Sequence, residues 1–599
     1  MHVLGKIESM VRHHYWQRTG GMLGFAVILG LGGGLAAACF RFSLLFVQEK
    51  ILHQFAGFPF TPHSGALPHY LFFLVPAVGG LLSGAIVYGF APEAAGAGTD
   101  ALIDAFHNRG GYIAFRTSIV KFFASVVTLG TGGCAGQEGP MAQIGGGMGS
   151  LLAKIFHLPE KARRILLLTG TAAGLGAIFH APLGAALTAA EIVYREDFES
   201  SGFLPFTVAS VVAFACFTVI THQHTAYLHF PAMPFGNVLE LFNYALVGLI
   251  CVPFSWAFIN VYRQTQRFFK GLRIKNFCKP AIGGLLVGLL AYLRPEVVGT
   301  NWKNLTDAVS GNFTFTTLLL IAGAKILATS LTIGSGGSGG VFGPSLFIGG
   351  MAGGAVGFGL HALNPAMVNN PGSYVLVGMG AFFAGAAKAP LAGLIMVCEI
   401  TGNYGLLPPL LIASTLHLAL SRKWSLYESQ RHDKFASPVH EHAMKVDVLK
   451  QIPLSRIFVP DGSVTVFGPG TTLADAYARI SISDQDVYPV LDKDGGVAGL
   501  VSSPALHLAV MGSAPENVLL LEDIMTEGYA LESGMELREA LNVFLQSGAH
   551  QLPVLGESGS IMGMLRLHDI MAHYDRITQG VAMRHTTLFD ETPGAKKAN

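Results

Sequence analysis

Two short segments carry the residue types that could do chemistry in this chain. Gly136-Gln-Glu-Gly-Pro140 and Gly340-Val-Phe-Gly-Pro344 share the pattern Gly-x-x-Gly-Pro and lie 204 residues apart. Proline fits the first turn of a helix and glycine lets the backbone approach a partner closely, so each segment predicts a helix start. The copies differ in charge at one position, where Glu138 in the first corresponds to Phe342 in the second.

Paired helix starts favour the binding of an anion, because they offer unpaired N–H groups and the positive end of the helix dipole. We expect the N–H groups of Val341 and Phe342 to donate to a small anion. The Glu138 carboxylate can compete with that anion, and a proton would remove its charge, so Glu138 is predicted to be both gate and proton acceptor. The alternatives are glycines that serve only helix packing and a glutamate in a structural ion pair.

The two segments belong to a longer internal repeat, in which residues 76–150 recur at 280–354. Lys121 and Lys325 also correspond, and we expect them to pair with carboxylates or helix C-termini. Of the 599 residues, 51% are hydrophobic and 13% are charged, against about 25% charged in soluble proteins. A duplicated apolar sequence interrupted by glycine predicts a transporter whose site lies at the repeat interface.

The fold class predicted from this pattern is an all-α polytopic membrane domain of two inverted-topology repeats with broken helices. We expect the domain to span 21–427, with halves at about 22–220 and 240–427, in contact with the lipid bilayer. Basic residues in the N-terminal segment 1–20 and at Arg422 predict that both termini are cytoplasmic, in a multi-pass protein of the plasma (cell inner) membrane.

Charge and cysteine usage exclude other classes of function. The net charge of +1 gives no indication of a nucleic-acid partner. The six cysteines show no metal-ligand spacing, so no metal site is predicted. His440-Glu-His442 lacks the His-Glu-x-x-His spacing of zinc proteases, so it does not support a metalloprotease, and no enzymatic activity is expected.

A second repeat, with a spacing of 64 residues, follows the apolar part. We expect a linker at 428–453, an α+β module at 454–577 and a disordered tail at 578–599. Each copy in the module predicts a helix, which begins near Leu473 in the first copy and near Leu537 in the second. The predicted β segments that follow are Val487–Leu491 and Gln551–Leu555.

The apolar part resembles the CLC family of chloride channels and chloride/proton exchangers over about 20–430. The four anion-site motifs of the family are matched in order by Gly96-Ala-Gly-Thr-Asp100, Gly136-Gln-Glu-Gly-Pro140, Gly340-Val-Phe-Gly-Pro344 and Tyr427. The resemblance therefore implies as anion-binding residues Gly96, Ala97, Gly98, Gly136, Gln137, Gly139, Pro140, Gly340, Val341, Phe342, Pro344 and Tyr427. It also implies chloride transport gated by Glu138, no cofactor in the membrane domain, and a homodimer with one pore per subunit.

Three departures from the family pattern alter the expected anion site. Ala97 replaces a serine whose hydroxyl would donate to the anion, and a hydrogen bond to a charged group is worth about 1.5–3 kcal/mol. Asp100 replaces a proline and adds negative charge. Gln137 replaces a basic residue beside the gating acid. We therefore expect weaker chloride binding, with fluoride or nitrate preference left open.

Ile192 bears on the mechanism of transport. Exchangers of the family usually carry a second glutamate at this position, which passes protons to the inner solution, whereas channels of the family carry an aliphatic residue. Ile192 therefore favours a voltage- or pH-gated chloride channel, with a chloride/proton antiporter as the alternative. An aliphatic residue does not prove a channel, because water can carry protons past it. The preceding Glu191 corresponds to Glu399 in the second half, which favours a shared structural role over a proton relay.

The C-terminal module resembles a pair of CBS (cystathionine-β-synthase) motifs, at about 457–510 and 521–575. Such pairs often bind adenine nucleotides, so ATP, AMP or adenosine are the candidate ligands. Asp569 and Gly563 fit the nucleotide-binding pattern, whereas Ala505 stands at the position equivalent to Asp569 in the first copy. We expect a structural or dimerising use of the pair. The alternative is a nucleotide-sensing protein in which transport is subordinate.

Overall fold

The computed structural model describes residues 19–58, 72–222, 238–299, 302–439, 452–480, 485–511 and 519–576, together with a few single residues between these ranges. The predicted tail at 578–599 and nearly all of the N-terminal segment 1–20 lie outside the described residues. The chain divides into two compact units, Met1–Val439 and His440–Asn599. Each unit is described by itself.

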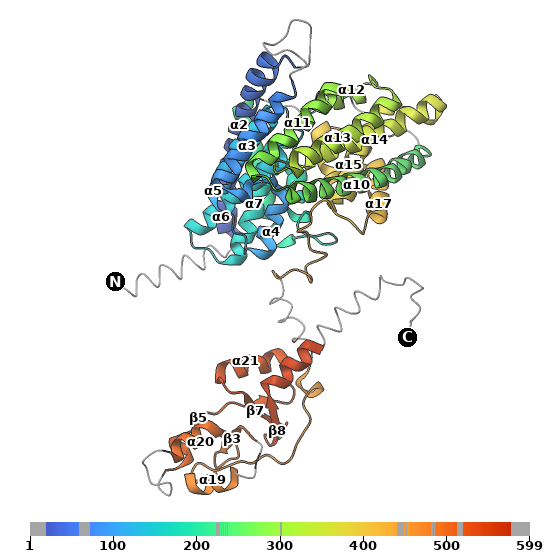
Figure 1. Ribbon diagram of the computed structural model, residues 1–599. Coiled ribbons are helices and arrows are strands. Elements are labelled where there is room, and N and C mark those ends of the chain that lie inside the picture. Colours follow the sequence, from blue (N-terminus) through green and yellow to red (C-terminus); the bar gives the residue numbers. More distant parts are fainter. Residues whose placement is uncertain are drawn as a thin grey trace, which may run out of the picture. The chain divides into compact units, whose positions relative to one another are not determined.

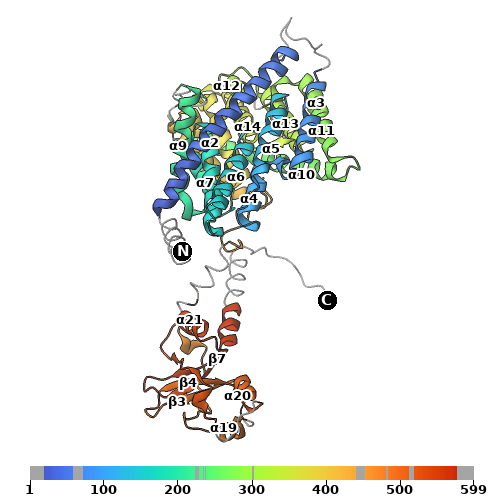
Figure 2. The same ribbon diagram turned by 90° about the vertical axis from the view of Figure 1, so that its left-hand side faces the viewer.

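The first unit is a bundle of helices in two halves with the same order of elements (Figure 1). The first half contains α2 (Thr19–Val47), α3 (Leu74–Phe90), α4 (Gly98–Asn108), α5 (Phe115–Gly130), α6 (Glu138–Ile155), α7 (Glu160–Phe179), α8 (Pro182–Glu191) and α9 (Phe203–Thr221). The second half contains α10 (Glu240–Gly271), α11 (Lys279–Leu293), α12 (Trp302–Val309), α13 (Phe315–Gly334), α14 (Phe342–Leu363), α15 (Pro371–Ala387), α16 (Pro390–Thr401) and α17 (Leu407–Leu420). Figure 2 shows α2 running obliquely along one side of the bundle, where it packs on α7 and α9.

Helix lengths and apolar composition fit a membrane. Within the described residues, seven helical segments are long and apolar enough to cross a bilayer. Shorter apolar helices such as Pro371–Ala387 and Pro390–Thr401 accompany them. Such short segments are stable at membrane depth only where protein or an aqueous cavity surrounds their ends. The predicted fold class of repeated halves with broken helices is confirmed.

The two halves contact one another through pairs of equivalent glycines. A Cβ on Gly80 of α3 would collide with the carbonyl of Pro280 in α11, and a Cβ on Gly284 of α11 would collide with the carbonyl of Pro76 in α3. The two contacts join equivalent residues with the roles of the helices exchanged. The helices α3 and α11 are therefore related by a local two-fold axis. The repeat in the sequence is therefore a repeat in space.

The first unit extends beyond the predicted boundary at 427. Residues up to Val439 belong to it, so the predicted linker at 428–453 is wrong for its first part. The physical reason is the buried side-chain amide of Gln430, which holds this segment against the helices. The Nε2 of Gln430 donates to the carbonyls of Ile192 (2.9 Å) and Ala387 (2.8 Å), which fixes the chain beyond Tyr427 against α8 and α15.

The second unit contains two copies of one α/β motif. In the first copy α19 (Leu473–Ile480) precedes a sheet of β3 (Val487–Leu491), β4 (Val497–Ser502) and β5 (Thr526–Glu527), with α20 (Ser503–Val510) after β4. In the second copy β6 (Leu531–Glu532) pairs with β7 (Gln551–Leu555), which pairs with β8 (Ile561–Arg566), and α21 (Leu537–Ser547) lies between β6 and β7.

The predicted helix starts and β segments of this unit are confirmed. The copies also share contacts, because Val487 and Leu500 of the first pack in the core of the second. In addition, the N–H of Asp486 donates to Oε1 of Gln551 (3.0 Å). The two motifs therefore fold together as one module.

Candidate functional site

The two Gly-x-x-Gly-Pro segments meet backbone to backbone. The N–H of Gly136 donates to the carbonyl of Gly340 (2.7 Å), and the N–H of Gly340 donates to the carbonyl of Gly136 (2.7 Å). A Cβ on Gly139 would lie 2.7 Å from Cα of Gly340, closer than real Cβ contacts. Only glycine permits this approach, so the predicted contact between the segments is present.

Glu138 and Phe342 are the first residues of α6 and α14. The side chain of Glu138 is 1% exposed, and its Oε2 accepts a hydrogen bond from the N–H of Gly343 (3.3 Å). Gly343 lies in the first turn of α14, where backbone N–H groups have no partner within the helix. The carboxylate of one half therefore binds the helix start of the other half, as a free anion would.

Gly343 was missed by the sequence reasoning, which named only Val341 and Phe342 as donors from this helix start. A signal was available, because the second amide of any helix is also unpaired within the helix. The Phe342 ring packs between Phe179 and Phe383, at centroid distances of 4.9 and 4.0 Å. These rings give the surroundings of the helix start low polarity, which strengthens any interaction between an N–H group and an anion.

The first predicted motif reaches the same place. Gly96 and Ala97 form β1, which pairs in parallel with Ser338 and Gly339 of β2 just before α14. The next residue, Gly98, opens α4, and a Cβ there would lie 2.6 Å from the carbonyl of Gly139. Three of the four predicted motifs therefore share one contact region. Gln137, Pro140 and Pro344 are buried in it.

Tyr427 supplies the fourth motif. Its side chain is 1% exposed, and it interacts electrostatically with both Glu138 and Asp100. The backbone that holds it is fixed by Leu426, whose N–H donates to the carbonyl of Ala386 (2.8 Å). The hydroxyl of Tyr427 is buried and makes no hydrogen bond of ordinary geometry with the described residues. It is therefore available to donate to an anion.

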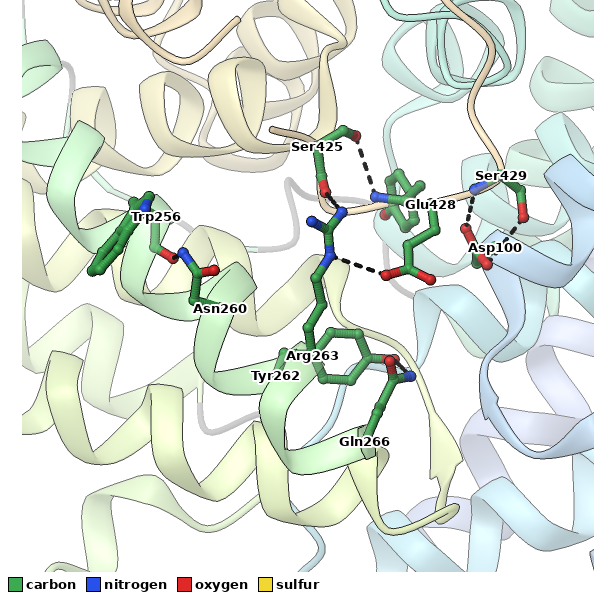
Figure 3. Close-up of polar contacts among 10 residues, drawn as sticks. Asp100, Trp256, Asn260, Tyr262, Arg263, Gln266, Ser425, Glu428 and Ser429 are labelled. Atoms are coloured by element: carbon green, nitrogen blue, oxygen red, sulfur yellow. Dashed lines mark hydrogen bonds and ion pairs between the residues drawn. The ribbon is translucent and has the colours of Figure 1, made fainter. Parts of the chain in front are cut away.

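The chain beyond Tyr427 lines one face of this region, which we call the inner face because the segment that follows the last helix of the unit, α17, lies there. Figure 3 shows that Asp100 of α4 accepts two hydrogen bonds from Ser429. Arg263 of α10 donates to the carbonyl of Ser425 (3.0 Å) and pairs with Glu428 (3.0 Å) (Figure 3). Charged groups therefore surround the approach to Tyr427.

Ile192, at the family's inner proton position, is 2% exposed and packs in the apolar core. The preceding Glu191 accepts hydrogen bonds from the N–H groups of Leu391 (3.2 Å) and Ala392 (2.8 Å) at the start of α16. Glu399 does the same for α8, at Leu183 (3.1 Å) and Gly184 (2.7 Å). These reciprocal hydrogen bonds agree with the structural role predicted for the two glutamates.

Lys121 and Lys325 are fully buried at equivalent positions. Lys121 Nζ donates to the carbonyls of Ala94 (3.1 Å) and Gly96 (2.7 Å), and Lys325 Nζ donates to the carbonyls of Val297 (3.1 Å) and Gly299 (2.6 Å). These acceptors lie at the ends of short helical turns, which agrees with the expected pairing to helix C-termini. The ammonium of Lys121 thus fixes the loop that carries Gly96.

No group of histidine, cysteine and acidic residues suited to a metal ion occurs among the described residues. In the second unit, the exposed Asp569 accepts a hydrogen bond from the N–H of Arg566 (3.3 Å). Gly563 is buried, and a Cβ on it would lie 2.9 Å from the ring of Phe458. Packing therefore explains this glycine without a ligand, and the nucleotide site stays a prediction.

Comparison with known proteins identifies the first unit. Residues 79–422 match the family model described as the voltage gated chloride channel, or CLC, family. The chain belongs to this family. Residues 521–576 match the CBS domain model, close to the predicted 521–575. The protein is therefore a CLC anion transporter of the membrane with a C-terminal CBS pair.

Curated relatives include proteins named as exchange transporters and one named as a chloride channel protein. The H(+)/Cl(-) exchange transporter ClcA of Cronobacter sakazakii is 32% identical over 393 residues, which cover 65% of this chain and 83% of the relative. ClcA of Yersinia pseudotuberculosis is 33% identical over 393 residues, which cover 65% of this chain and 81% of the relative. A relative from Ralstonia nicotianae, named as a ClcB-like chloride channel protein, is 32% identical over 402 residues, covering 65% and 91%.

Solved structures agree on the fold. A slow cyanobacterial Cl−/H+ antiporter superimposes with a TM-score of 0.61 at 23% identity, covering 72% of this chain and 98% of that one. A eukaryotic CLC transporter superimposes with a TM-score of 0.54 at 19% identity, covering 92% and 97%. The second alignment extends over nearly the whole chain, including the region of the CBS pair.

Proposed function

We propose that this protein exchanges chloride for protons and that Glu138 is the gate. The observation that carries the proposal is the hydrogen bond from Gly343 N–H to the Glu138 carboxylate across the two halves. An ionised Glu138 holds the position that an anion would take. A proton on Glu138 removes the charge, releases the amide and lets chloride bind in its place. Proton and anion thus use the site in turn.

The proposed anion site takes its donors from the third and fourth motifs. The N–H groups of Val341, Phe342 and Gly343 and the hydroxyl of Tyr427 are the donors. Ala97 provides no hydroxyl, so the backbone contributes more here than in the family pattern. Helix N-termini suit a transported ion because they carry partial positive charge and no full cation that would retain it.

The names of the relatives favour exchange over the channel first expected. Several CLC proteins about 32% identical to this chain are named H(+)/Cl(-) exchange transporters. A chloride channel is the second candidate, and Ile192 favours it because an aliphatic side chain cannot carry a proton. The choice depends on whether protons reach Glu138 from the inner side by a route other than Ile192.

A reversal-potential measurement separates the two candidates. The full chain is reconstituted in planar bilayers with equal chloride and a tenfold proton gradient. Exchange predicts a reversal potential displaced from zero in the direction set by the proton gradient. A reversal potential that stays at zero with open chloride conductance would establish the channel and refute exchange.

Assembly and location complete the proposal. We propose a homodimer in the plasma membrane with both termini in the cytoplasm, and light scattering of the detergent complex tests the dimer. For the CBS pair we propose a structural or dimerising role. Calorimetry of the full chain with ATP, AMP and adenosine tests the nucleotide alternative, and heat that is lost in Asp569→Ala would establish it.

A further inference from the structure

Proton exchange needs a path for protons between Glu138 and the inner side, and this requirement rests on the proposed function. Ile192 cannot titrate. Glu191 and Glu399 each use both carboxylate oxygens to cap a helix of the other half. Both oxygens of each carboxylate are thus already engaged by N–H groups at a helix start, which favours a structural role for the two glutamates. An acid that takes up protons on the inner side is therefore to be sought elsewhere, around Tyr427.

Asp100 lies at the required place. It is in the first turn of α4, and its side chain is partly exposed, so water at the inner face reaches it. Its Oδ1 accepts from the N–H of Ser429 (3.0 Å) and its Oδ2 accepts from the hydroxyl of Ser429 (3.1 Å) (Figure 3). The carboxylate is thereby fixed beside the segment that carries Tyr427.

Tyr427 connects this carboxylate to the gate. Its buried side chain interacts electrostatically with both Asp100 and Glu138. Thr99 contributes a further hydroxyl beside Tyr427. A hydroxyl can donate one proton while it accepts another, so Tyr427 with water can pass a proton between two carboxyl groups without a change in its own charge.

The charges around Asp100 do not neutralise it. Glu428 and Asp104 both act on the carboxylate with like charge. Arg263, the nearby cation on α10, pairs with Glu428 and with the Ser425 carbonyl. The buried hydroxyl of Tyr262 on the same helix also interacts with Asp100. An ionised Asp100 therefore repels an anion entering from this face, and a protonated one does not.

We propose that Asp100 is the inner proton acceptor of this protein. A proton from the inner solution binds an Asp100 oxygen, and the neutral side chain lets chloride pass. The proton then leaves Asp100 for the Tyr427 hydroxyl or a water molecule, which gives one of its own protons to Glu138. Asp100 returns to the carboxylate and no net charge accumulates.

The test uses the full chain in liposomes, with chloride efflux and proton uptake recorded together by electrodes. Asp100→Asn keeps the size of the side chain and removes the titrating group. We expect the number of protons moved per chloride to fall at least tenfold while chloride efflux persists. Asp104→Asn, one turn further along α4, is the matched control and should change the ratio less than twofold.

Ser429→Ala is a second test, in which the measured quantity is the inner pH at half-maximal proton transport. A merely structural contact between Ser429 and Asp100 would not change this pH. The substitution leaves the acid in place and removes the hydroxyl that stabilises its ionised form. Because a hydrogen bond to a charged group corresponds to about one pH unit or more, the inner pH at half-maximal proton transport should rise by about one unit. Chloride efflux at saturating proton concentration should be unchanged.

The outcomes are distinct. An unchanged ratio of protons to chloride in Asp100→Asn overturns the proposal. If that variant transports neither ion, an unchanged pH profile in Ser429→Ala overturns it and a displaced profile supports it. A wild-type protein that moves chloride without protons refutes the exchange function itself, and this result is recognised from the wild-type record alone.

Discussion

Glu138, the first residue of α6, accepts a hydrogen bond from the backbone N–H of Gly343, the second residue of α14. The two residues come from different halves of the repeat, so their contact joins the helix starts that face each other. The copies differ at this contact, because the first carries the carboxyl of Glu138 where the second carries the phenyl ring of Phe342. Its chemistry can be tested residue by residue.

Glu138→Gln removes the charge and keeps the shape of the side chain. We expect chloride transport that no longer depends on external pH, because a neutral amide does not displace the anion. Proton transport should be lost, since no carboxyl remains to carry the proton. Chloride flux from liposomes at external pH 5 and pH 8 measures this, and a variant that is still fully pH-dependent would place the gate elsewhere.

Gly139→Ala tests the close approach of the two helix starts. The added methyl would lie 2.7 Å from Cα of Gly340, and overpacking of this kind costs about 1–3 kcal/mol. We expect a lower melting temperature in detergent and reduced chloride flux. The control is Gly89→Ala in α3, where nothing lies within 4 Å of the added atom. Equal behaviour of the two variants would contradict the tight contact.

Glu191→Gln tests the structural role of the reciprocal helix caps. The substitution removes the charge at the start of α16 and should destabilise the protein by about 1 kcal/mol, because a carboxylate at a helix N-terminus interacts with the dipole. Glu399→Gln should cost a similar amount at α8. Thermal unfolding measures the loss, and the number of protons per chloride should stay at its wild-type value in both. A normal melting temperature combined with lost proton transport would assign Glu191 to the relay.

Ala97→Ser restores the hydroxyl that the family pattern contains. A hydrogen bond to an anion is worth about 1.5–3 kcal/mol. A change of about 1.4 kcal/mol in the binding free energy corresponds to a tenfold change in affinity. We therefore expect chloride to bind about tenfold or more tightly, as measured by calorimetry. Ala101→Ser, one turn further along α4, serves as the control. Equal affinities for Ala97→Ser and the wild type would show that position 97 does not face the anion.

Sequence alone predicted much of the site because the duplication marks it. The repeat placed Gly136 opposite Gly340, and the Gly-x-x-Gly-Pro pattern gave both helix starts. The pairing of β1 with β2 could not be predicted, since two residues are too few for a periodic pattern. The anchoring of Gln430 beyond Tyr427 was also missed, because a polar residue after the last apolar helix is typical of a linker. Contacts that depend on distant backbone carbonyls leave no local signal.

The central claim is that the Glu138 carboxylate and a transported anion compete for the amides at the start of α14. Crystals of wild type and Glu138→Gln soaked in bromide test it through anomalous scattering. The account predicts a bromide peak within hydrogen-bond distance of Gly343 N in the variant and none there in the wild type at neutral pH. A bromide bound at that amide in both proteins, or in neither, would contradict it.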